Sequence, residues 1–433
     1  MNRRNPLAIG MILGSILTIG ILILVNTSWQ GLAFANTPES VKNSTESLSA
    51  SAIKPHKVNG LNYPTGRIPQ EIRNGVYPRS YFPGTEKVGK EEMRVTAVGT
   101  GMPNQTPTNA AACFLVELGN GESFLFDLGT GSTDRLAGLE LDYSKLDKVF
   151  ASHLHTDHIG DIAALWIGGW LGGRYMPLQV YGPSGSEPAL GIKAHIDHIR
   201  EAWAWDVTSR AGTLPNAGGE IEAHEFDFAK TAVIYEENGV KITSFPAIHI
   251  RDGSVSFRLE WNDLSFVFGG DSAPNKWFLK EAKGVDLVVH ECFFTPEQWM
   301  EISGFPYKQA YWVTSVIHTP PEAFGKIMSA VKPRMAVAYH YWNHRDIEFE
   351  MHEAIRTTYD GPLAMAADLT VFNVTKDKIE VREVSFNHEA WPQGSSTEWD
   401  TAPRGDPATG LMSEWLVEGT VKEMIPPPTQ PLD

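Results

Sequence analysis

A short run of metal-binding side chains, residues 152–161, constrains this chain more than any other stretch. It places three histidines and an aspartate within six residues, His153-Leu154-His155-Thr156-Asp157-His158. The apolar alternation just upstream, at 146–151, predicts a short strand, and residues 162–166 downstream predict the start of a helix. A ligand cluster on a strand-to-helix loop is held at its base and open at its top. That arrangement suits a catalytic metal, which keeps one coordination position for water.

The spacing within this run indicates two metal ions. His153 and His155 are separated by one residue, so in an extended chain their side chains point the same way. Asp157 and His158 follow a turn and aim at a second point nearby. Two neighbouring ions, which two-metal sites hold about 3.5–4 Å apart, accommodate all four side chains better than one ion does. The alternative is a polar loop in which the histidines occur by chance.

Strands alternate with helices twice along the chain, which predicts two β-sheets packed face to face with helices outside. The predicted strands lie at 93–99, 113–118, 123–129, 177–182, 240–246, 255–261, 264–269, 285–290 and 335–338. Further candidate ligands, His249, Asp271 and His340, stand at the ends of later strands. Each alone has an ordinary structural explanation. The series favours a site, because strand ends of a common sandwich can converge on one rim.

Charge and cysteine content narrow the classes of function. The formal net charge is −16, whereas a protein that holds long nucleic acid usually carries a basic face, because phosphate neutralisation dominates such binding. We therefore expect no polyanionic partner, while a small anionic substrate near metal ions stays open. The two cysteines, Cys113 and Cys292, can form neither a disulfide framework nor a cysteine-rich zinc site, and their apolar surroundings predict core positions.

The N-terminus predicts export to the periplasm or another extracytoplasmic location. Two arginines precede an uncharged run at 7–25, and Ala33-Phe34-Ala35 has the small-x-small pattern of a cleavage site. Residues 1–35 are therefore either a cleaved signal peptide or a membrane anchor through residues 7–25. The other expected divisions are a disordered linker at 36–57, an extended lead-in at 58–92, a catalytic domain at 93–386 with an acidic insertion at about 184–238, and a Pro-rich tail at 387–433.

Several motifs together resemble the metallo-β-lactamase superfamily, and within it the ribonuclease Z/arylsulfatase-like branch. They are the run at 153–158, Gly99-Thr100-Gly101-Met102-Pro103, the segment 177–185, His290-Glu291-Cys292-Phe293 and His318-Thr319. The resemblance covers about residues 93–375 and implies an α/β fold, the αββα four-layer sandwich of that superfamily. More narrowly, the Trp-rich stretch 164–174, with 274–277 and 337–340, resembles the exported metallo-hydrolases of guanitoxin biosynthesis.

The resemblance also implies a role for each candidate residue. One zinc ion is bound by His153, His155 and His249, a second by Asp157, His158 and His340, and Asp271 bridges the two. Mn²⁺ or Fe²⁺ are alternative ions. A bridging water becomes hydroxide near neutral pH and attacks phosphorus, sulfur or carbonyl carbon. Glu291 and His318 protonate the leaving group or brace the site, and Asp157 joins them as a catalytic residue.

The resulting expectation is an exported di-zinc hydrolase of a small-molecule ester, a phosphate or sulfate ester. Nucleic acid is excluded as a partner, because the insertion is acidic where ribonuclease Z carries a basic arm for tRNA. A homodimer stays open, as do two other functions, a lactone or cyclic-amide hydrolase and a catalytically silent zinc-binding protein. Six tryptophans are candidates for a small-molecule pocket, with core packing as the alternative: Trp166, Trp170, Trp203, Trp205, Trp312 and Trp342.

Overall fold

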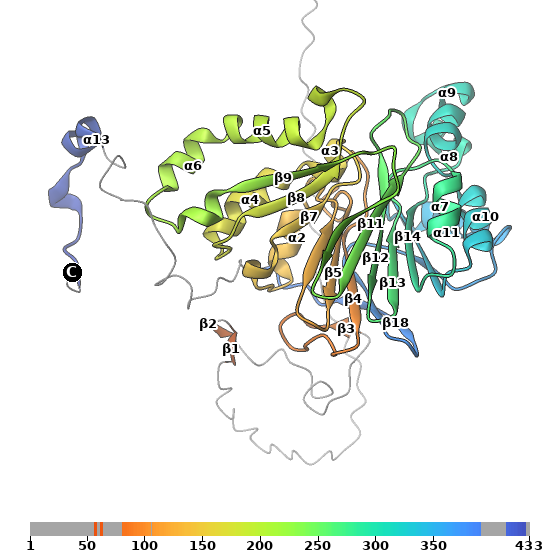
Figure 1. Ribbon diagram of the computed structural model, residues 1–433, viewed down its shortest axis with the longest axis horizontal. Coiled ribbons are helices and arrows are strands. Elements are labelled where there is room, and N and C mark those ends of the chain that lie inside the picture. Colours follow the sequence, from red (N-terminus) through yellow and green to blue (C-terminus); the bar gives the residue numbers. More distant parts are fainter. Residues whose placement is uncertain (1–55, 59–60, 64–79, 105, 391–412, 430–433) are drawn as a thin grey trace, which may run out of the picture. The chain divides into compact units, whose positions relative to one another are not determined.

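Two mixed β-sheets organise this computed structural model, which describes residues 56–58, 61–63, 80–104, 106–390 and 413–429 (Figure 1). The expected signal peptide or anchor at 1–35 lies outside the described residues, as does most of the expected linker at 36–57. Within the described ranges, no helix combines the length and apolar character needed to cross a membrane. The strands β1 (His56–Val58) and β2 (Leu61–Tyr63) pair only with each other among these residues.

The first sheet has nine strands and carries the loop with the histidine run. In spatial order these are β3 (Ser80–Tyr81), β18 (Ile379–Val384), β17 (Thr370–Val374), β4 (Met93–Gly99), β5 (Cys113–Leu118), β6 (Ser123–Phe126), β7 (Lys148–Phe150), β8 (Leu178–Pro183) and β9 (Ile221–Phe226). Pairing is antiparallel from β18 to β6 and parallel from β6 to β9. The parallel part needs helical crossovers, and these place helices on its outer face.

The second sheet has seven strands and carries the later candidate ligands. Its order is β10 (Ala232–Glu237), β11 (Val240–Pro246), β12 (Val255–Trp261), β13 (Leu264–Phe268), β14 (Leu287–Glu291), β15 (Met335–Tyr339) and β16 (Leu363–Met365). Pairing is antiparallel from β10 to β13 and parallel from β13 to β16. The carboxyl ends of β11, β13, β14 and β15 therefore lie at one edge of this sheet.

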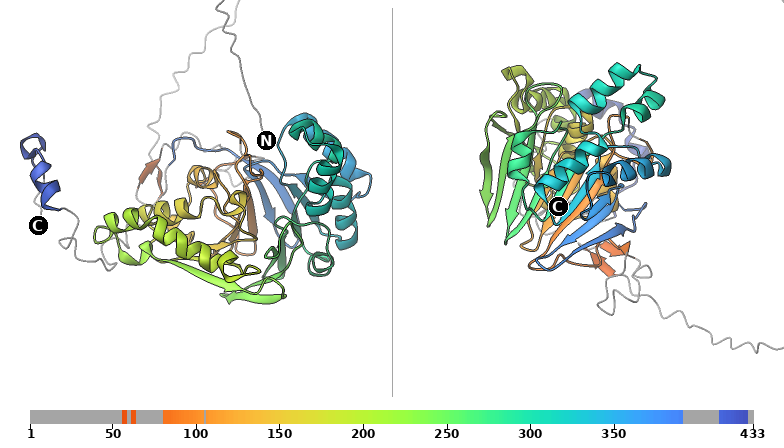
Figure 2. Two further views of the ribbon diagram at one scale, coloured as in Figure 1. Left: turned by 90° about the horizontal axis from the view of Figure 1, so that it is seen from above. Right: turned by 90° about the vertical axis from the view of Figure 1, so that its right-hand side faces the viewer.

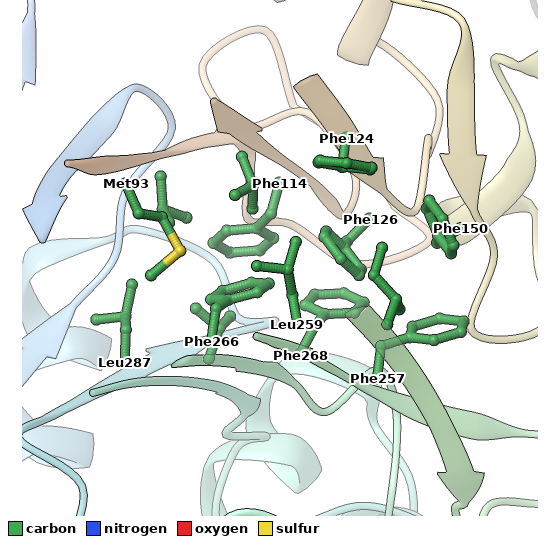
Figure 3. Packing of buried hydrophobic residues seen from close by; sticks show 14 of the residues in the cluster. Met93, Phe114, Phe124, Phe126, Phe150, Phe257, Leu259, Phe266, Phe268 and Leu287 are labelled. Carbon is green, nitrogen blue, oxygen red and sulfur yellow. The ribbon is translucent and has the colours of Figure 1, made fainter. Parts of the chain in front are cut away.

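The main core fills the space between the two sheets. Aromatic side chains from both inner faces interdigitate there, as Figure 3 shows for Phe114 and Phe126 on one side and Phe266 and Phe268 on the other. The ring centroids of Phe126 and Phe266 are 5.2 Å apart in an edge-to-face arrangement. Each fully buried phenylalanine contributes about 1.5–3 kcal/mol through burial alone. This core joins the sheets rigidly below the edge that carries the candidate ligands.

Helices cover both outer faces, which completes an αββα sandwich (Figures 1 and 2). On the nine-stranded sheet they are α2 (Ser132–Gly138), α4 (Ile162–Leu171), α5 (Ile192–Ala202) and α6 (Ala204–Arg210). On the seven-stranded sheet they are α7 (Lys276–Glu281), α8 (Pro296–Ser303), α9 (Tyr307–Tyr311), α10 (Pro321–Val331) and α11 (Arg345–Arg356). The short helix α13 (Glu414–Gly419) follows the range 391–412, which is not described. The predicted fold class is confirmed.

The expected insertion at 184–238 contributes to both sheets. Besides α5 and α6 it contains β9, the edge strand of the nine-stranded sheet, and β10, the edge strand of the seven-stranded sheet. Its helix α5 presents Ile192, Ile196 and Ile199 at i, i+4 and i+7, and these side chains pack into the outer core of the nine-stranded sheet. The segment is thus part of the sandwich.

Candidate metal centre

The histidine run lies where the sequence predicts it, between β7 and a one-turn helix, α3 (Thr156–Ile159). His155 is the N-cap of α3 and still has an extended backbone, so it points the same way as His153. Leu154, between them, packs with the outer apolar core. As a result Nε2 of His153 lies 2.9 Å from Nδ1 of His155. Asp157 and His158 lie on the turn of α3 itself, both buried.

One group of four side chains gathers around the two alternating histidines: His153, His155, His249 and Asp271. Nε2 of His249 lies 3.4 Å from Nδ1 of His155. Oδ2 of Asp271 lies 4.0 Å from Nε2 of His153 and 3.9 Å from Nε2 of His249. His155 is the exposed member, so this group opens to solvent on one side.

A second group shares Asp271 and is buried throughout: Asp157, His158, Asp271 and His340. Nε2 of His340 lies 3.2 Å from Oδ2 of Asp157 and 3.3 Å from Oδ2 of Asp271. Nε2 of His158 lies 3.5 Å from Oδ2 of Asp157 and 3.3 Å from Oδ1 of Asp271. The structure thus brings all seven candidate ligands together, with Asp271 between the two groups.

These donor sets fit metal ions. Ligand atoms about 2.0–2.1 Å from a tetrahedral zinc ion are about 3.3 Å from one another, close to most of the separations above. Among the described residues, Oδ1 of Asp157, Oδ1 of Asp271 and Nε2 of His158 are buried and have no hydrogen-bond partner. Buried polar atoms normally have partners, so these three atoms, which lie close together, fit a bound cation.

The electrostatics of the two groups also favour cations. Burial opposes ionisation of Asp157, yet the imidazoles of His158 and His340 hold the pKa of that carboxyl well below its ordinary value. Burial lowers the pKa of His249 to about 4, so its imidazole is neutral at neutral pH and can act as a ligand. Burial alone would lower the pKa of His158, but the carboxylates of Asp271, Asp157 and Asp127 raise it well above its ordinary value.

Three partners outside the ligand set hold ligands in place. Asp127 contacts His158, with Oδ2 2.6 Å from Nδ1, and Nδ1 of His249 lies 2.9 Å from the carbonyl oxygen of Ile317. These contacts occupy Nδ1 of each histidine, so Nε2 of His158 faces the second donor group and Nε2 of His249 faces the first. His340 has a φ of 75°, a left-handed conformation, and its backbone N–H donates to the carbonyl oxygen of Thr100 at 2.8 Å. This bond fixes a backbone conformation that a histidine rarely adopts.

The expected proton-transfer pair, Glu291 and His318, lies beside the shared carboxylate. Oε2 of Glu291 is 2.7 Å from Nδ1 of His318, and Oε1 accepts from the N–H of Ser272 at 2.5 Å. Nδ1 of His318 is 3.8 Å from Oδ2 of Asp271. Burial raises the pKa of Glu291 and lowers that of His318 to about 4, so both shifts disfavour charge on the pair. Phe293 stacks on His318 with ring centroids 4.3 Å apart. Proton donor and brace both remain predictions.

The tryptophans expected around a pocket divide into two sets. Trp166 and Trp170 are buried and donate to the carbonyl oxygens of Gly219 and Pro215 at 3.2 and 2.7 Å, so they tie α4 to the 215–219 turn. Trp342 is partly buried and packs against the outer core of the seven-stranded sheet. In contrast, Trp203, Trp205 and Trp312 are 40, 80 and 46 % exposed. Core packing therefore accounts for the first set and leaves the second unexplained.

Sequence reasoning missed Asp368 as a support for the centre. Its Oδ1 accepts from the N–H and the hydroxyl of Thr100, both at 2.9 Å, and Thr100 in turn holds the backbone of His340. Asp368 and Thr100 are 268 positions apart, and no motif joins them. Asp127 also supports the ligand loop directly, because it accepts from the backbone N–H of Ser152 at 2.6 Å.

Comparisons with known proteins agree with this geometry. Residues 122–341, about half of the chain, match the family described as beta-lactamase superfamily domain. The chain belongs to the beta-lactamase superfamily. It is 30% identical over 204 residues to a ribonuclease Z of Mycobacterium marinum, spanning 46% of this chain and 70% of the relative. A ribonuclease Z of Mycobacterium bovis is 31% identical over 206 residues, spanning 46% of this chain and 69% of the relative.

A solved structure shows the same fold. The metallo-beta-lactamase fold protein YhfI from Bacillus subtilis superposes with a TM-score of 0.50 at 20% identity, covering 65% of this chain and 100% of that chain. The predicted superfamily and its ribonuclease Z-like branch are confirmed, and so is the prediction of a metal-dependent hydrolase. The structure contains residue groups suited to metal ions, while the identity and number of the ions stay predictions.

The exclusion of nucleic acid as a partner is wrong. The curated relatives are ribonucleases by name, and they match across most of their own length. The expectation rested on the acidic insertion at about 184–238 and on the net charge of −16, which counts residues wherever they lie in the chain. It also omits the positive charge of metal ions at the site, which can bind phosphate directly. A small-molecule substrate, expected together with that exclusion, has no support from these relatives.

Proposed function

We propose that this chain is a di-zinc hydrolase of phosphodiesters. The observation that carries the proposal is the position of Asp271, whose Oδ1 faces His158 at 3.3 Å while its Oδ2 faces His340 at 3.3 Å and His249 at 3.9 Å. A carboxylate that belongs to both donor groups supports two ions held close together. Paired ions suit phosphoryl chemistry, in which the attacking and leaving oxygens both need stabilisation.

Each side chain has a defined task in this proposal. His153, His155 and His249 hold one ion with Asp271, and Asp157, His158 and His340 hold the other with the same carboxylate. Bound zinc supplies a nucleophile by lowering the pKa of water, and it neutralises charge on phosphate oxygens. Asp127 and the Ile317 carbonyl keep their histidines oriented. Glu291 is hydrogen-bonded to Nδ1 of His318, so when Nε2–H gives its proton to the leaving oxygen, the carboxyl proton of Glu291 moves to Nδ1 and Glu291 becomes a carboxylate.

The relatives support phosphorus over sulfur or carbon as the attacked atom. A ribonuclease cleaves phosphodiester bonds, and the two quoted relatives are both ribonuclease Z. Nothing in the donor groups by itself distinguishes a phosphodiester from a sulfate ester or a lactone, because the same water attacks all three. The choice of diester therefore rests on family membership together with the two-ion geometry.

The test is a metal measurement combined with a substrate panel on the full-length protein. We expect two zinc ions per chain and chelator-sensitive hydrolysis of bis(4-nitrophenyl) phosphate, with a precursor tRNA, 4-nitrophenyl sulfate and a lactone as comparison substrates. Asp157→Ala should abolish hydrolysis and leave the fold intact. Asp161→Asn is the matched control, because that carboxylate accepts from Thr133 at 2.8 and 2.9 Å instead. Full activity of Asp157→Ala, or turnover of the sulfate or lactone alone, would overturn the proposal.

A further inference from the structure

The chain leaves the metal centre after Glu291 and returns to it at His318 through an aromatic-rich helical segment. This segment comprises α8, α9 and a π-helix at Trp312–Ile317, which directly continues α9. Figure 1 shows α8 and α9 beyond the edge of the seven-stranded sheet. π-helical turns are rare and occur frequently at functional sites. The segment from Tyr307 to Ile317 is called the aromatic segment below.

The aromatic segment ends in contact with the metal centre. The carbonyl oxygen of Ile317 lies 2.9 Å from Nδ1 of His249, and the next residue, His318, lies 2.7 Å from Glu291. A π-helix pairs residue i with residue i+5, so Trp312 lies one turn away from Ile317. The exposed ring of Trp312 is therefore about one helical turn from a residue that touches a proposed ligand.

The two faces of the aromatic segment differ in burial. Ala310 and Thr314 are completely buried and face the protein. Tyr311, Trp312 and Val316 are 48, 46 and 46 % exposed, so their side chains face solvent. Tyr307 is 52 % exposed, and its ring stacks near that of Tyr311, with centroids 6.2 Å apart and an interplanar angle of 29°.

Exposed apolar side chains also flank His249 on its own loop. Ile248 is 43 % exposed and Ile250 is 49 % exposed. His249 therefore lies between two stretches with exposed apolar side chains, because its Nδ1 is 2.9 Å from the carbonyl oxygen of Ile317 at the end of the aromatic segment. Exposed apolar side chains that lie near one candidate site commonly mark a binding surface.

The charges of α8 and the aromatic segment argue against recognition of further phosphates by these helices. Between Pro296 and Ile317 the charged residues are Glu297, Glu301 and Lys308, so the segment is net acidic. A surface that bound several phosphates would need clustered lysine or arginine. Exposed rings beside a phosphate-binding centre instead suit a flat, uncharged group that is attached to that phosphate.

We propose that the exposed ring of Trp312 forms a stacking surface for a planar aromatic group, such as a nucleobase, that is esterified to the phosphate held at the metal centre. The inference rests on the proposed diester hydrolysis and names its substrate class as diesters with an aromatic substituent. Stacking of one base on an aromatic side chain contributes about 1–3 kcal/mol, which corresponds to about 5–150-fold in binding.

The experiment compares two diesters that share one leaving group. Methyl 4-nitrophenyl phosphate and thymidine 5′-(4-nitrophenyl phosphate) differ only in the retained substituent. The ratio of their kcat/KM values therefore isolates recognition of that substituent. We expect the full-length protein to prefer the thymidine ester about tenfold or more, and Trp312→Leu to lower that preference about tenfold, mainly through KM. Trp205→Leu, which removes an exposed tryptophan from α6, should leave the preference unchanged.

Three results would overturn the inference. If both diesters are hydrolysed without a preference for the thymidine ester, the proposed function is supported but the stacking surface is refuted. If Trp312→Leu and Trp205→Leu show the same preference for the thymidine ester over the methyl ester, the stacking surface is likewise refuted. If Trp312→Leu instead converts a dimer to a monomer in sedimentation velocity while the preference is unchanged, the aromatic segment is a subunit contact.

A separate measurement applies if neither diester is hydrolysed, in which case the proposed function fails. Calorimetric titration with thymidine 5′-monophosphate then tests the stacking surface independently of hydrolysis. Weaker binding to Trp312→Leu than to Trp205→Leu supports it, and equal binding overturns it.

Discussion

The Oδ2 atom of Asp127 lies 2.6 Å from Nδ1 of His158, and both side chains are completely buried. The same carboxylate accepts from the N–H of Ser152 at 2.6 Å and from its hydroxyl at 2.7 Å. Asp127 itself has a φ of 57°, a left-handed conformation. One buried carboxylate therefore fixes the start of the ligand loop and the ring orientation of His158, whose Nε2 then faces Asp157 and Asp271.

Asp127→Asn should weaken the second metal group specifically. The amide carries no charge to stabilise the imidazole and cannot reproduce all three contacts. We expect zinc affinity at this group to fall about 10–100-fold, as for other partners of metal-binding histidines. Zinc retained per chain against a competing chelator measures the effect. Asp161→Asn, a buried carboxylate bonded to Thr133, is the control, and equal retention in both variants would contradict the assignment.

His318→Gln should reveal whether the Glu291–His318 pair donates a proton. A general acid matters most when the leaving oxygen is strongly basic, and removing one costs about 10²–10⁴-fold. We expect that loss with an alkoxide leaving group and a loss of less than about tenfold with 4-nitrophenolate, which needs no proton. Rates for a series of diesters with leaving groups of graded pKa check this. A loss of the same size throughout the series would assign the pair a bracing role instead.

The sandwich and the convergence of the seven candidate side chains were predictable because both leave local signals. The run His153 to His158 is contiguous, His340 directly follows a strand of strongly apolar sequence, and Asp271 comes three residues after another. Strand periodicity then predicts that such residues lie at sheet edges, and two sheets with one common edge bring them together.

The supporting contacts and the partner were not predictable in this way. Asp368 and the Ile317 carbonyl act on residues far away in sequence, and a backbone carbonyl carries no side-chain signal. Trp170 and Trp312 look alike in sequence, yet one is buried and the other half exposed. The exclusion of nucleic acid failed because neither the net charge nor the acidic insertion describes the charge at the metal centre itself.

Arg174→Met should destabilise the protein. The guanidinium is buried and donates to four carbonyl oxygens, those of Leu165, Trp166, Met176 and Gly218, at 2.8–3.1 Å. The variant leaves these acceptors without their donor, at a cost of about 2–4 kcal/mol in the free energy of unfolding. Urea unfolding measures it. The control is Arg210→Met, which removes a partly exposed pair with Asp206 on α6 and should cost less than about 1 kcal/mol. Similar losses would refute the role of Arg174.

Asp271→Asn and Asp157→Asn should differ in how many ions they lose. Asp271 belongs to both donor groups, whereas Asp157 belongs only to the second group, with His158 and His340. We therefore expect Asp157→Asn to retain about one tightly bound zinc ion and Asp271→Asn to weaken both. Zinc that binds only the folded state stabilises it by about 2.7 kcal/mol at 100 times the dissociation constant, so added zinc should raise Tm of the unaltered protein by several degrees. That rise should be smaller in Asp157→Asn and nearly absent in Asp271→Asn. Identical zinc content and identical Tm shifts in the two variants would show that Asp271 does not bridge the groups.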